Sequence, residues 1–134
     1  MPPIILWFRR DLRLQDHAAL TAAVGKGGPV IAVFICDELV EPLGAAPKWR
    51  LGVGVAALQA AITAKSNRLI LRRGPALATL KALVAETGAK AIYWQRAYDP
   101  KSQLRDTEIK EAMVAQGLEA KSFKGHLLFE PWTV

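Results

Sequence analysis

The sequence opens with an uninterrupted apolar run, Ile4 to Phe8, that ends directly at a cluster of charged residues. Apolar residues without alternation suit a strand that is buried on both faces of a parallel sheet. The charged residues that follow are Arg9, Arg10, Asp11 and Arg13. Because ligands of open α/β sheets bind outside the carboxyl ends of the strands, this turn is a candidate binding site. Asp16 is predicted to cap a helix that starts at His17.

The rest of the chain repeats this unit of a short apolar strand followed by a helix. Further strands are predicted at Val30 to Ile35, Leu69 to Leu71, Ala91 to Trp94 and Glu119 to Phe123. Helices are predicted at Lys48 to Lys65, Ala76 to Thr87 and Lys101 to Gln116, with a loop from Leu39 to Pro47. Five strands alternating with four helices indicate a three-layer, Rossmann-like α/β fold, in which helices cover both faces of a five-stranded parallel sheet.

Composition limits the classes of protein that need to be considered. A chain of 134 residues with 51% hydrophobic and 22% charged residues fits one globular domain. The net charge of +6 either attracts a polyanion or only maintains solubility. The single cysteine, Cys36, excludes a disulfide framework. The longest uncharged run, Leu51 to Ala64, is shorter than a membrane span, and no basic region precedes the first apolar run as in a secretory signal. We therefore expect a cytoplasmic protein without membrane contact.

Charged and polar residues recur where the predicted strands end, and parallel strands would gather them at one edge. These residues are Arg9, Arg10, Asp37, Arg72, Arg73, Gln95, Arg96 and Lys124. Two interpretations remain open. The edge is either a solvated rim with a few ion pairs, such as Arg10 with Asp11, or a cleft for a ligand or a second domain.

The sequence shows no pattern typical of a catalytic or metal site. The turn after the first strand lacks the glycines that a dinucleotide needs, and His17, His126 and Cys36 have no suitably spaced partner. The acidic residues Asp99, Asp106, Glu108 and Glu111 are predicted to form a solvated helix face.

Two kinds of residue in the predicted helices and strands have more than one interpretation. Gly52 and Gly54 lower the helix propensity of their segment, so we expect something large to pack closely there. Trp49 and Trp94 are either core residues or stacking surfaces for a flat ring. Cys36 is predicted to be a small buried residue or part of a cleft.

The segment WFRRDLRLQDHAAL, residues 7–20, resembles the N-terminal signature of the DNA photolyase and cryptochrome family. The resemblance continues through SNRLILRRGP, YWQRAYDP with Arg105 and Asp106 behind it, and LLFEPW. It implies the strand order 3-2-1-4-5. It also implies an antenna-binding α/β domain at residues 1–125, the start of an interdomain linker at 126–134, and a helical FAD domain that is absent from this chain.

The resemblance further implies a cofactor and the residues that hold it. The α/β domain of the family helps to hold an antenna chromophore, a folate or a deazaflavin, in a cleft between the domains. Carried over position by position, the cleft residues are Arg9, Phe34, Cys36, Asp37, Lys48, Trp49, Leu51, Arg96, Tyr98 and Lys101. Ala97, Lys48 and the pair Lys101 and Ser102 depart from the patterns of known deazaflavin and folate binders, so both the identity of the chromophore and whether one is bound stay open.

Three functional hypotheses follow. In the first, the complete protein is a monomeric photolyase that repairs cyclobutane pyrimidine dimers by blue-light-driven electron transfer from reduced FAD, and it contacts damaged DNA mainly through the helical domain. In the second, the same domain belongs to a cryptochrome-like photoreceptor. In the third, the chain is a free-standing nucleotide-binding α/β module. The isolated α/β domain is not expected to be catalytic in any of them.

Overall fold

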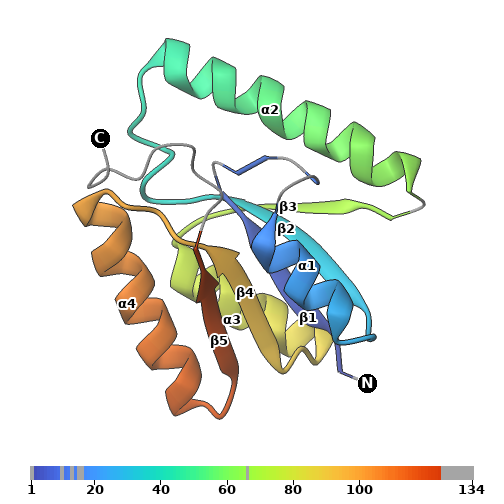
Figure 1. Ribbon diagram of the computed structural model, residues 1–134. Helices are drawn as coiled ribbons and strands as arrows, with labels where there is room; N and C mark the ends of the chain where they lie inside the picture. The colour runs from blue at the N-terminus through green and yellow to red at the C-terminus, as the bar shows by residue number, and fades with distance from the viewer. Residues whose placement is uncertain (1, 10, 13, 15–16, 66, 125–134) are drawn as a thin grey trace.

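The computed structural model describes residues 2–9, 11–12, 14, 17–65 and 67–124 as alternating strands and helices (Figure 1). In chain order the elements are β1 (Ile4–Phe8), α1 (Ala18–Gly25), β2 (Val30–Cys36), α2 (Ala45–Ala64), β3 (Leu69–Arg73), α3 (Ala76–Thr87), β4 (Ala91–Gln95), α4 (Pro100–Ala115) and β5 (Glu119–Phe123). The predicted Arg10, Arg13, Asp16 and His126, and the predicted linker at 126–134, lie outside the described residues.

The five strands form one parallel sheet in the order β3-β2-β1-β4-β5, which confirms the order that the resemblance implied. The most buried strand, β1, lies in the middle, with Leu6 opposite Ala32 of β2 and Tyr93 of β4. Since every pair is parallel, all five carboxyl ends lie at one edge of the sheet. The charged turn after β1 therefore lies at the middle of that edge.

The two faces of the sheet carry separate cores, as expected for three layers. Ile5 and Trp7 of β1 face α3 and α4, which contribute Leu80 and Ile109. Leu6 and its even-numbered neighbours face α1 and α2, whose buried residues are Ala19, Ala23, Leu58 and Ile62. Figure 1 shows α1 in front of the sheet and α3 behind it. The strict alternation along β1 explains why its sequence has no polar position.

Several element boundaries differ from the prediction by one to three residues, and three of these differences affect the site. Helix α1 is capped by His17, whose Nδ1 accepts a hydrogen bond from the backbone amide of Leu20, whereas the predicted cap, Asp16, lies outside the described residues. Helix α2 begins at Ala45, because Pro47 lies in the first turn, where its missing amide is not needed. Strand β3 continues to Arg73, which is paired in register with Cys36.

Helix α2 approaches the sheet closely at one glycine. A Cβ atom at Gly54 would lie 2.8 Å from Cδ1 of Leu12, in the turn after β1, whereas nothing lies within 4 Å of the same point at Gly52. The expected close packing is therefore confirmed for Gly54 and wrong for Gly52. This contact sets the position of α2 above the charged turn.

None of the helices within the described residues combines the length and apolarity required to cross a membrane.

Candidate functional site

A cavity of about 800 Å³ opens at the carboxyl edge of the sheet, between the turn after β1, the end of β2, the start of α2 and the loop from β4 to α4. Its volume lies within the range of small-molecule pockets, about 300 to 1,000 Å³. The predicted site residues that line it are Arg9, Phe34, Asp37, Leu51, Arg96, Tyr98 and Lys101. At this part of the edge the structure therefore contains a cavity, as the cleft interpretation predicts.

Three predicted site residues do not line the cavity. Lys48 and Cys36 both contact Glu41: Lys48 Nζ donates to the backbone oxygen at 2.9 Å, and Cys36 Sγ donates to Oε1 at 3.3 Å. Partial burial and this neighbouring carboxylate raise the pKa of the Cys36 thiol, which is only half-buried and not fully buried as one interpretation expected. Trp49 lies on the outer side of α2 and is 70% exposed.

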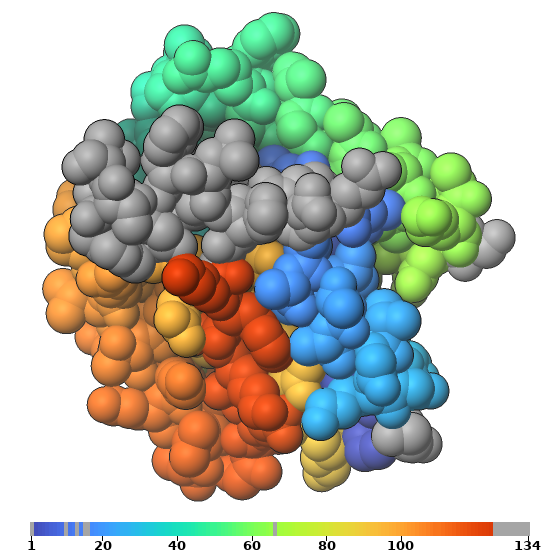
Figure 2. Space-filling view, in the orientation of Figure 1, coloured from blue at the N-terminus to red at the C-terminus, as the bar shows by residue number. Residues whose placement is uncertain are grey.

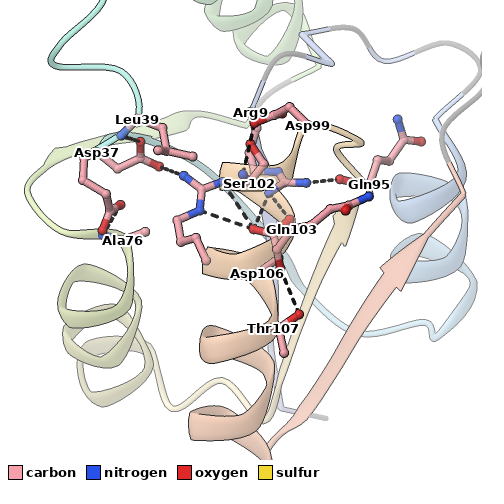
Figure 3. A network of polar contacts seen from close by, with 12 residues as sticks. Arg9, Asp37, Leu39, Ala76, Gln95, Asp99, Ser102, Gln103, Asp106 and Thr107 are labelled. Atoms are coloured by element: carbon pink, nitrogen blue, oxygen red, sulfur yellow. Dashed lines mark hydrogen bonds and ion pairs between the residues drawn. The ribbon is translucent and has the colours of Figure 1, made fainter. Parts of the chain in front are cut away.

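The side chain of Arg9 is held beneath the cavity by fixed partners. Its Nη1 lies 2.6 Å from both carboxylate oxygens of Asp106, and its Nη2 donates to the backbone oxygen of Gln95 (Figure 3). The guanidinium also lies 4.9 Å from the ring centre of Trp7. Because both terminal nitrogens of Arg9 bind these groups, its guanidinium forms part of the floor of the cavity and its charge is already paired, although its buried Nε has no hydrogen-bond partner within the described residues.

Arg105 extends this network to the end of β2. Its Nη1 donates to Asp37 Oδ2 at 2.7 Å, its Nη2 lies 3.3 Å from Asp106 Oδ1, and its guanidinium lies 5.0 Å from the ring centre of Trp7. Asp37 and Asp106 both project toward the network in Figure 3. The predicted solvated position of Asp106 is wrong, since only 13% of its side chain is exposed.

Asp37 shows how this environment changes ionisation. Burial raises the pKa of its carboxyl group, while the Arg105 guanidinium and the backbone amide of Leu39, which donates to Oδ1 at 2.9 Å, act in the opposite direction. Its neighbour Glu38 also lines the cavity, and Glu38 Oε1 accepts a hydrogen bond from the backbone amide of Ala76 at the start of α3 at 3.2 Å. The floor is therefore a set of mutually compensating charges, as buried ions require.

A second buried pair holds the turn after β1. Asp11 Oδ1 accepts from the backbone amide of Arg9 at 2.8 Å, and Oδ2 contacts His17 Nε2. Since Nδ1 of His17 accepts from the amide of Leu20, the imidazole proton must be on Nε2 and point toward Asp11. Burial opposes ionisation of Asp11, but these bonds outweigh it and lower its pKa. His17 is thus structural, as predicted.

The remaining charged residues of the edge divide into two groups. Arg96 and Lys101 line the cavity, and Arg96 Nε lies 3.3 Å from Ser122 Oγ. Arg72 and Arg73 are exposed on β3 and form ion pairs with Glu86 and Glu41. The edge therefore combines both interpretations: it is a cleft near β1 and β4 and a solvated rim at β3.

The described part of the chain contains no cluster of three or more residues suited to hold a metal ion. The cavity has an apolar wall from Phe34 and Leu51 and a neutralised floor, and its other charged lining residues are the cations Arg96 and Lys101 and the carboxylates Asp11, Glu38 and Asp99. Such a site can bind a flat ring that carries an anionic group.

Arg105 and Asp106 were not among the predicted site residues, although both belong to the network beneath the cavity. A usable indication was present in the helical period: Arg105 and Asp106 lie one turn from Ser102 and from Ile109, which are both buried. Residues that lie three or four positions from two buried residues of a helix are on the same face of the helix as those residues.

Comparison with known proteins gives a consistent assignment. The sequence model of the family described as DNA photolyase matches residues 4–134. The chain is 45% identical over 129 residues to a deoxyribodipyrimidine photo-lyase of Agrobacterium fabrum, covering 96% of this chain and 27% of that protein. It is 40% identical over 134 residues to Cryptochrome-1 of Arabidopsis thaliana, covering 97% of this chain and 20% of that protein. The crystal structure of a bacterial class III photolyase from Agrobacterium tumefaciens superposes with a TM-score of 0.91 at 44% identity, covering 99% of this chain and 28% of that one. The chain thus spans about a quarter of the length of these relatives.

Proposed function

Because this chain belongs to the DNA photolyase family and has the α/β fold of its N-terminal domain, we propose that it holds the antenna chromophore of a light-driven DNA repair enzyme. The observation that supports this most directly is the cavity at the carboxyl edge of the sheet, which is lined by most of the residues that the resemblance had singled out. The chromophore is a folate or a deazaflavin. When bound, it absorbs light and passes the energy to a flavin.

The residues around the cavity suit such a group. Phe34 and Leu51 offer apolar contact to a flat ring and exclude water from one side of it. Arg96 and Lys101 are placed to attract an anionic tail. The neutralised floor around Arg9 adds rigidity instead of net charge. An antenna needs a constant position and orientation, and a rigid floor supplies both.

The chromophore pocket can be tested by charge reversal at its mouth. Lys101→Glu should weaken retention of the chromophore by about tenfold, because it replaces attraction of the anionic tail by repulsion. Lys110→Glu on the same helix makes the same change in charge at an exposed position away from the cavity, so it should bind normally. The measurement is the chromophore absorbance per mole of purified protein, with folate and deazaflavin supplied in separate arms. Equal retention by both variants would contradict the assignment of the pocket.

For the complete protein we propose repair of cyclobutane pyrimidine dimers by electron transfer from reduced FAD, with the FAD and most of the DNA contact in a helical domain. The similarity to a deoxyribodipyrimidine photo-lyase supports this activity. The test exposes dimer-containing DNA to the product of the full-length gene, with and without blue light. Loss of dimers only under light is expected, and equal loss in the dark would exclude the activity.

A photoreceptor is the second candidate, because Cryptochrome-1 of Arabidopsis thaliana is 40% identical over 134 residues. The same assay separates the two functions. A full-length protein that binds FAD and responds to blue light, but leaves dimers intact, would support the photoreceptor.

A further inference from the structure

Positive charge is concentrated in one continuous part of the sequence. Residues 48–85 contain seven Lys and Arg residues and no Asp or Glu, whereas the rest of the chain contains eleven Lys and Arg and twelve Asp and Glu residues. The net charge of +6 therefore comes entirely from this segment. Charge that only maintains solubility can lie anywhere on the surface, so its concentration in one segment indicates a local role.

This segment forms α2, the edge strand β3 and most of α3 (Figure 1). The last two residues of β3 project to opposite faces of the sheet, since side chains alternate along a strand. Arg72 Nη2 lies 3.4 Å from Oε1 of Glu86, on α3, and Arg73 Nε lies 3.3 Å from Oε1 of Glu41, in the loop before α2. Lys48 Nζ, in the first turn of α2, lies 3.8 Å from Oε2 of Glu41. Cations from β3 and α2 thus meet at the carboxyl end of this edge.

Two further cations lie at the amino end of the same edge. Lys65 follows α2 and Arg68 precedes β3; both are exposed, and neither forms an ion pair within the described residues. The extended chain from Arg68 to Arg73 spans about 17 Å, and the helix from Lys48 to Lys65 spans about 26 Å. In Figure 2 the yellow-green atoms of this end project from the molecule on the side away from α4, in orange. We call this row of cations the basic edge: Lys48, Lys65, Arg68, Arg72 and Arg73.

The opposite edge of the sheet, formed by β5 and flanked by α4, has a different charge pattern. Residues 99–124 contain five Lys or Arg and five Asp or Glu, and Lys121 Nζ lies 3.8 Å from Oε1 of Glu119 on β5 itself. Charged residues on an edge strand prevent it from pairing with other chains. That role requires charges on the strand but not charges of one sign, and it does not account for Lys48 and Lys65. The single sign of the charge at the basic edge therefore needs a further explanation.

We propose that the basic edge binds the phosphate backbone of duplex DNA without reading its sequence. A row of about 17 to 26 Å corresponds to about 5 to 8 base pairs, since each base pair adds about 3.4 Å of helix axis. Such a row fits a linear polyanion, which Arg72 and Arg73 can contact from both sides, better than it fits a flat lipid surface. Proteins bind single-stranded DNA by stacking its bases on aromatic side chains, and the basic edge contains none.

The two acids beside the basic edge do not prevent this contact. The side chains of Glu41 and Glu86 are 45% and 56% exposed, and exposed ion pairs are weak because water and salt screen them. Their arginine partners can therefore exchange a carboxylate for a phosphate. With both acids included, the edge keeps an excess of positive charge.

The choice of DNA as the partner rests on the proposed function, but the basic edge is separate from the cavity, since none of its residues lines it. The helical domain proposed for the complete protein would follow β5, which is the opposite edge of the sheet. Contact between DNA and the basic edge would therefore be additional to the contacts of that domain.

Fluorescence anisotropy of a short labelled duplex without lesions, measured in the dark with the purified 134-residue chain, tests the proposal. Arg68→Glu/Arg72→Glu should weaken binding by more than about tenfold and reduce the slope of log affinity against log salt by about 2. Lys26→Glu/Lys110→Glu is the matched control: it makes the same change in net charge at two exposed lysines on the side of β5, and its affinity should stay within about twofold of the parent. Equal weakening by both variants, or no binding by the parent at low salt, would overturn the proposal.

A conservative variant separates the effect of charge from an effect on folding. Arg68→Lys/Arg72→Lys keeps both positive charges, so its affinity should stay within about threefold of the parent. A loss as large as that of Arg68→Glu/Arg72→Glu would show that the two arginines maintain the fold and do not act through their charge, which would also overturn the proposal.

Two further probes identify the occupant: a single strand of the same sequence, and vesicles of phosphatidylserine and phosphatidylcholine. Both should bind more weakly than the duplex, and tighter binding of either would overturn the choice of duplex DNA. Retention of the chromophore, measured on the same samples, should be normal in Arg68→Glu/Arg72→Glu. Loss of duplex binding by the parent with normal retention would refute the basic edge alone, whereas duplex binding without retention would refute the chromophore pocket alone.

Discussion

The two helices beside the cavity, α2 and α4, are held in opposite ways. Helix α4 turns two charged residues inward: Asp106 binds Arg9, which follows β1, at 2.6 Å, and Arg105 binds Asp37, which follows β2, at 2.7 Å. Helix α2 has no polar contact of this kind with the sheet within the described residues. Its anchors are the two buried residues Leu58 and Ile62 and the contact of Gly54 with Leu12.

This difference shows how a pocket can combine one rigid wall with one adjustable wall. Directional ion pairs fix the angle and register of α4, because buried charges tolerate little displacement. Apolar contacts are less directional, so α2 can shift slightly without losing a specific partner. A ring bound in the cavity would then be oriented by contacts on the rigid α4 side, while small shifts of α2 would adjust the cavity to the shape of the ring.

The largest expected effect is the removal of the carboxylate shared by the two arginines. Asp106→Ala leaves Arg9 and Arg105 partly unpaired below the surface, which should cost about 3 to 5 kcal/mol of unfolding free energy. Glu111→Ala removes an acid from the exposed side of the same helix and should cost less than about 0.5 kcal/mol. Denaturant unfolding measures both. Similar losses would mean that the network does not hold α4.

The next effect concerns the anchors of α2. Leu58→Ala should cost about 2 to 5 kcal/mol, the usual range for a buried leucine. In this variant only Ile62 remains fully buried in α2. The amide protons of α2 should therefore lose more protection from hydrogen exchange than the amide protons of α4. Hydrogen exchange read by mass spectrometry checks this. An equal loss of protection in α2 and α4 would contradict the conclusion that the two helices are anchored differently.

A smaller effect is expected for the turn on which α2 rests. The lowered pKa of Asp11 means that its ionised form stabilises the fold above the ordinary value of 3.8, and that this contribution disappears as the pH falls through the lowered value. Asp11→Asn should reduce stability at neutral pH by about 1 to 3 kcal/mol. It should also flatten the loss of stability below pH 3.8. Thermal unfolding of both proteins at a series of pH values from neutral to below 3.8 measures this effect. Parallel plots of stability against pH for the variant and the parent protein would contradict the role of Asp11.

The smallest effect separates the two glycines of α2. Gly52→Ala should stabilise the protein by about 0.5 to 1 kcal/mol, because the added methyl group gains helix propensity and meets nothing within 4 Å. Gly54→Ala should gain less or lose stability, since its methyl group would press on Leu12. Chemical denaturation of the pair measures the difference. A larger gain at Gly54 would show that this contact does not position α2.

Much of the fold could be predicted from local patterns. Unbroken apolar runs predict parallel strands because such strands are buried on both faces, and the helical period locates the helices between them. The strand order required the resemblance, since periodicity does not say which strands are neighbours. The cap at His17 escaped prediction because imidazole is an uncommon capping group, whereas Asp16 is a common one.

Phe34, Asp37 and Tyr98 were predicted as site residues through the resemblance, and all three line the cavity. The site was less predictable where the partner is distant in sequence. Arg9 looked like an available cation because Asp106 lies 97 residues further on. Trp49 was predicted to line the cleft, but its side chain is exposed on the outer side of α2. An aromatic residue at the start of a helix does not by itself indicate whether it faces the protein or the solvent.

The separation of Arg9 and Asp106 by 97 residues in the sequence also affects folding during synthesis. While a ribosome is still synthesising β4, the guanidinium of Arg9 has no carboxylate to receive it, and the central strand would carry an uncompensated charge below its surface. The ion-pair network at this edge of the sheet can therefore form only after α4 has left the ribosome. A nascent chain therefore cannot complete the floor of the cavity until α4 has been translated.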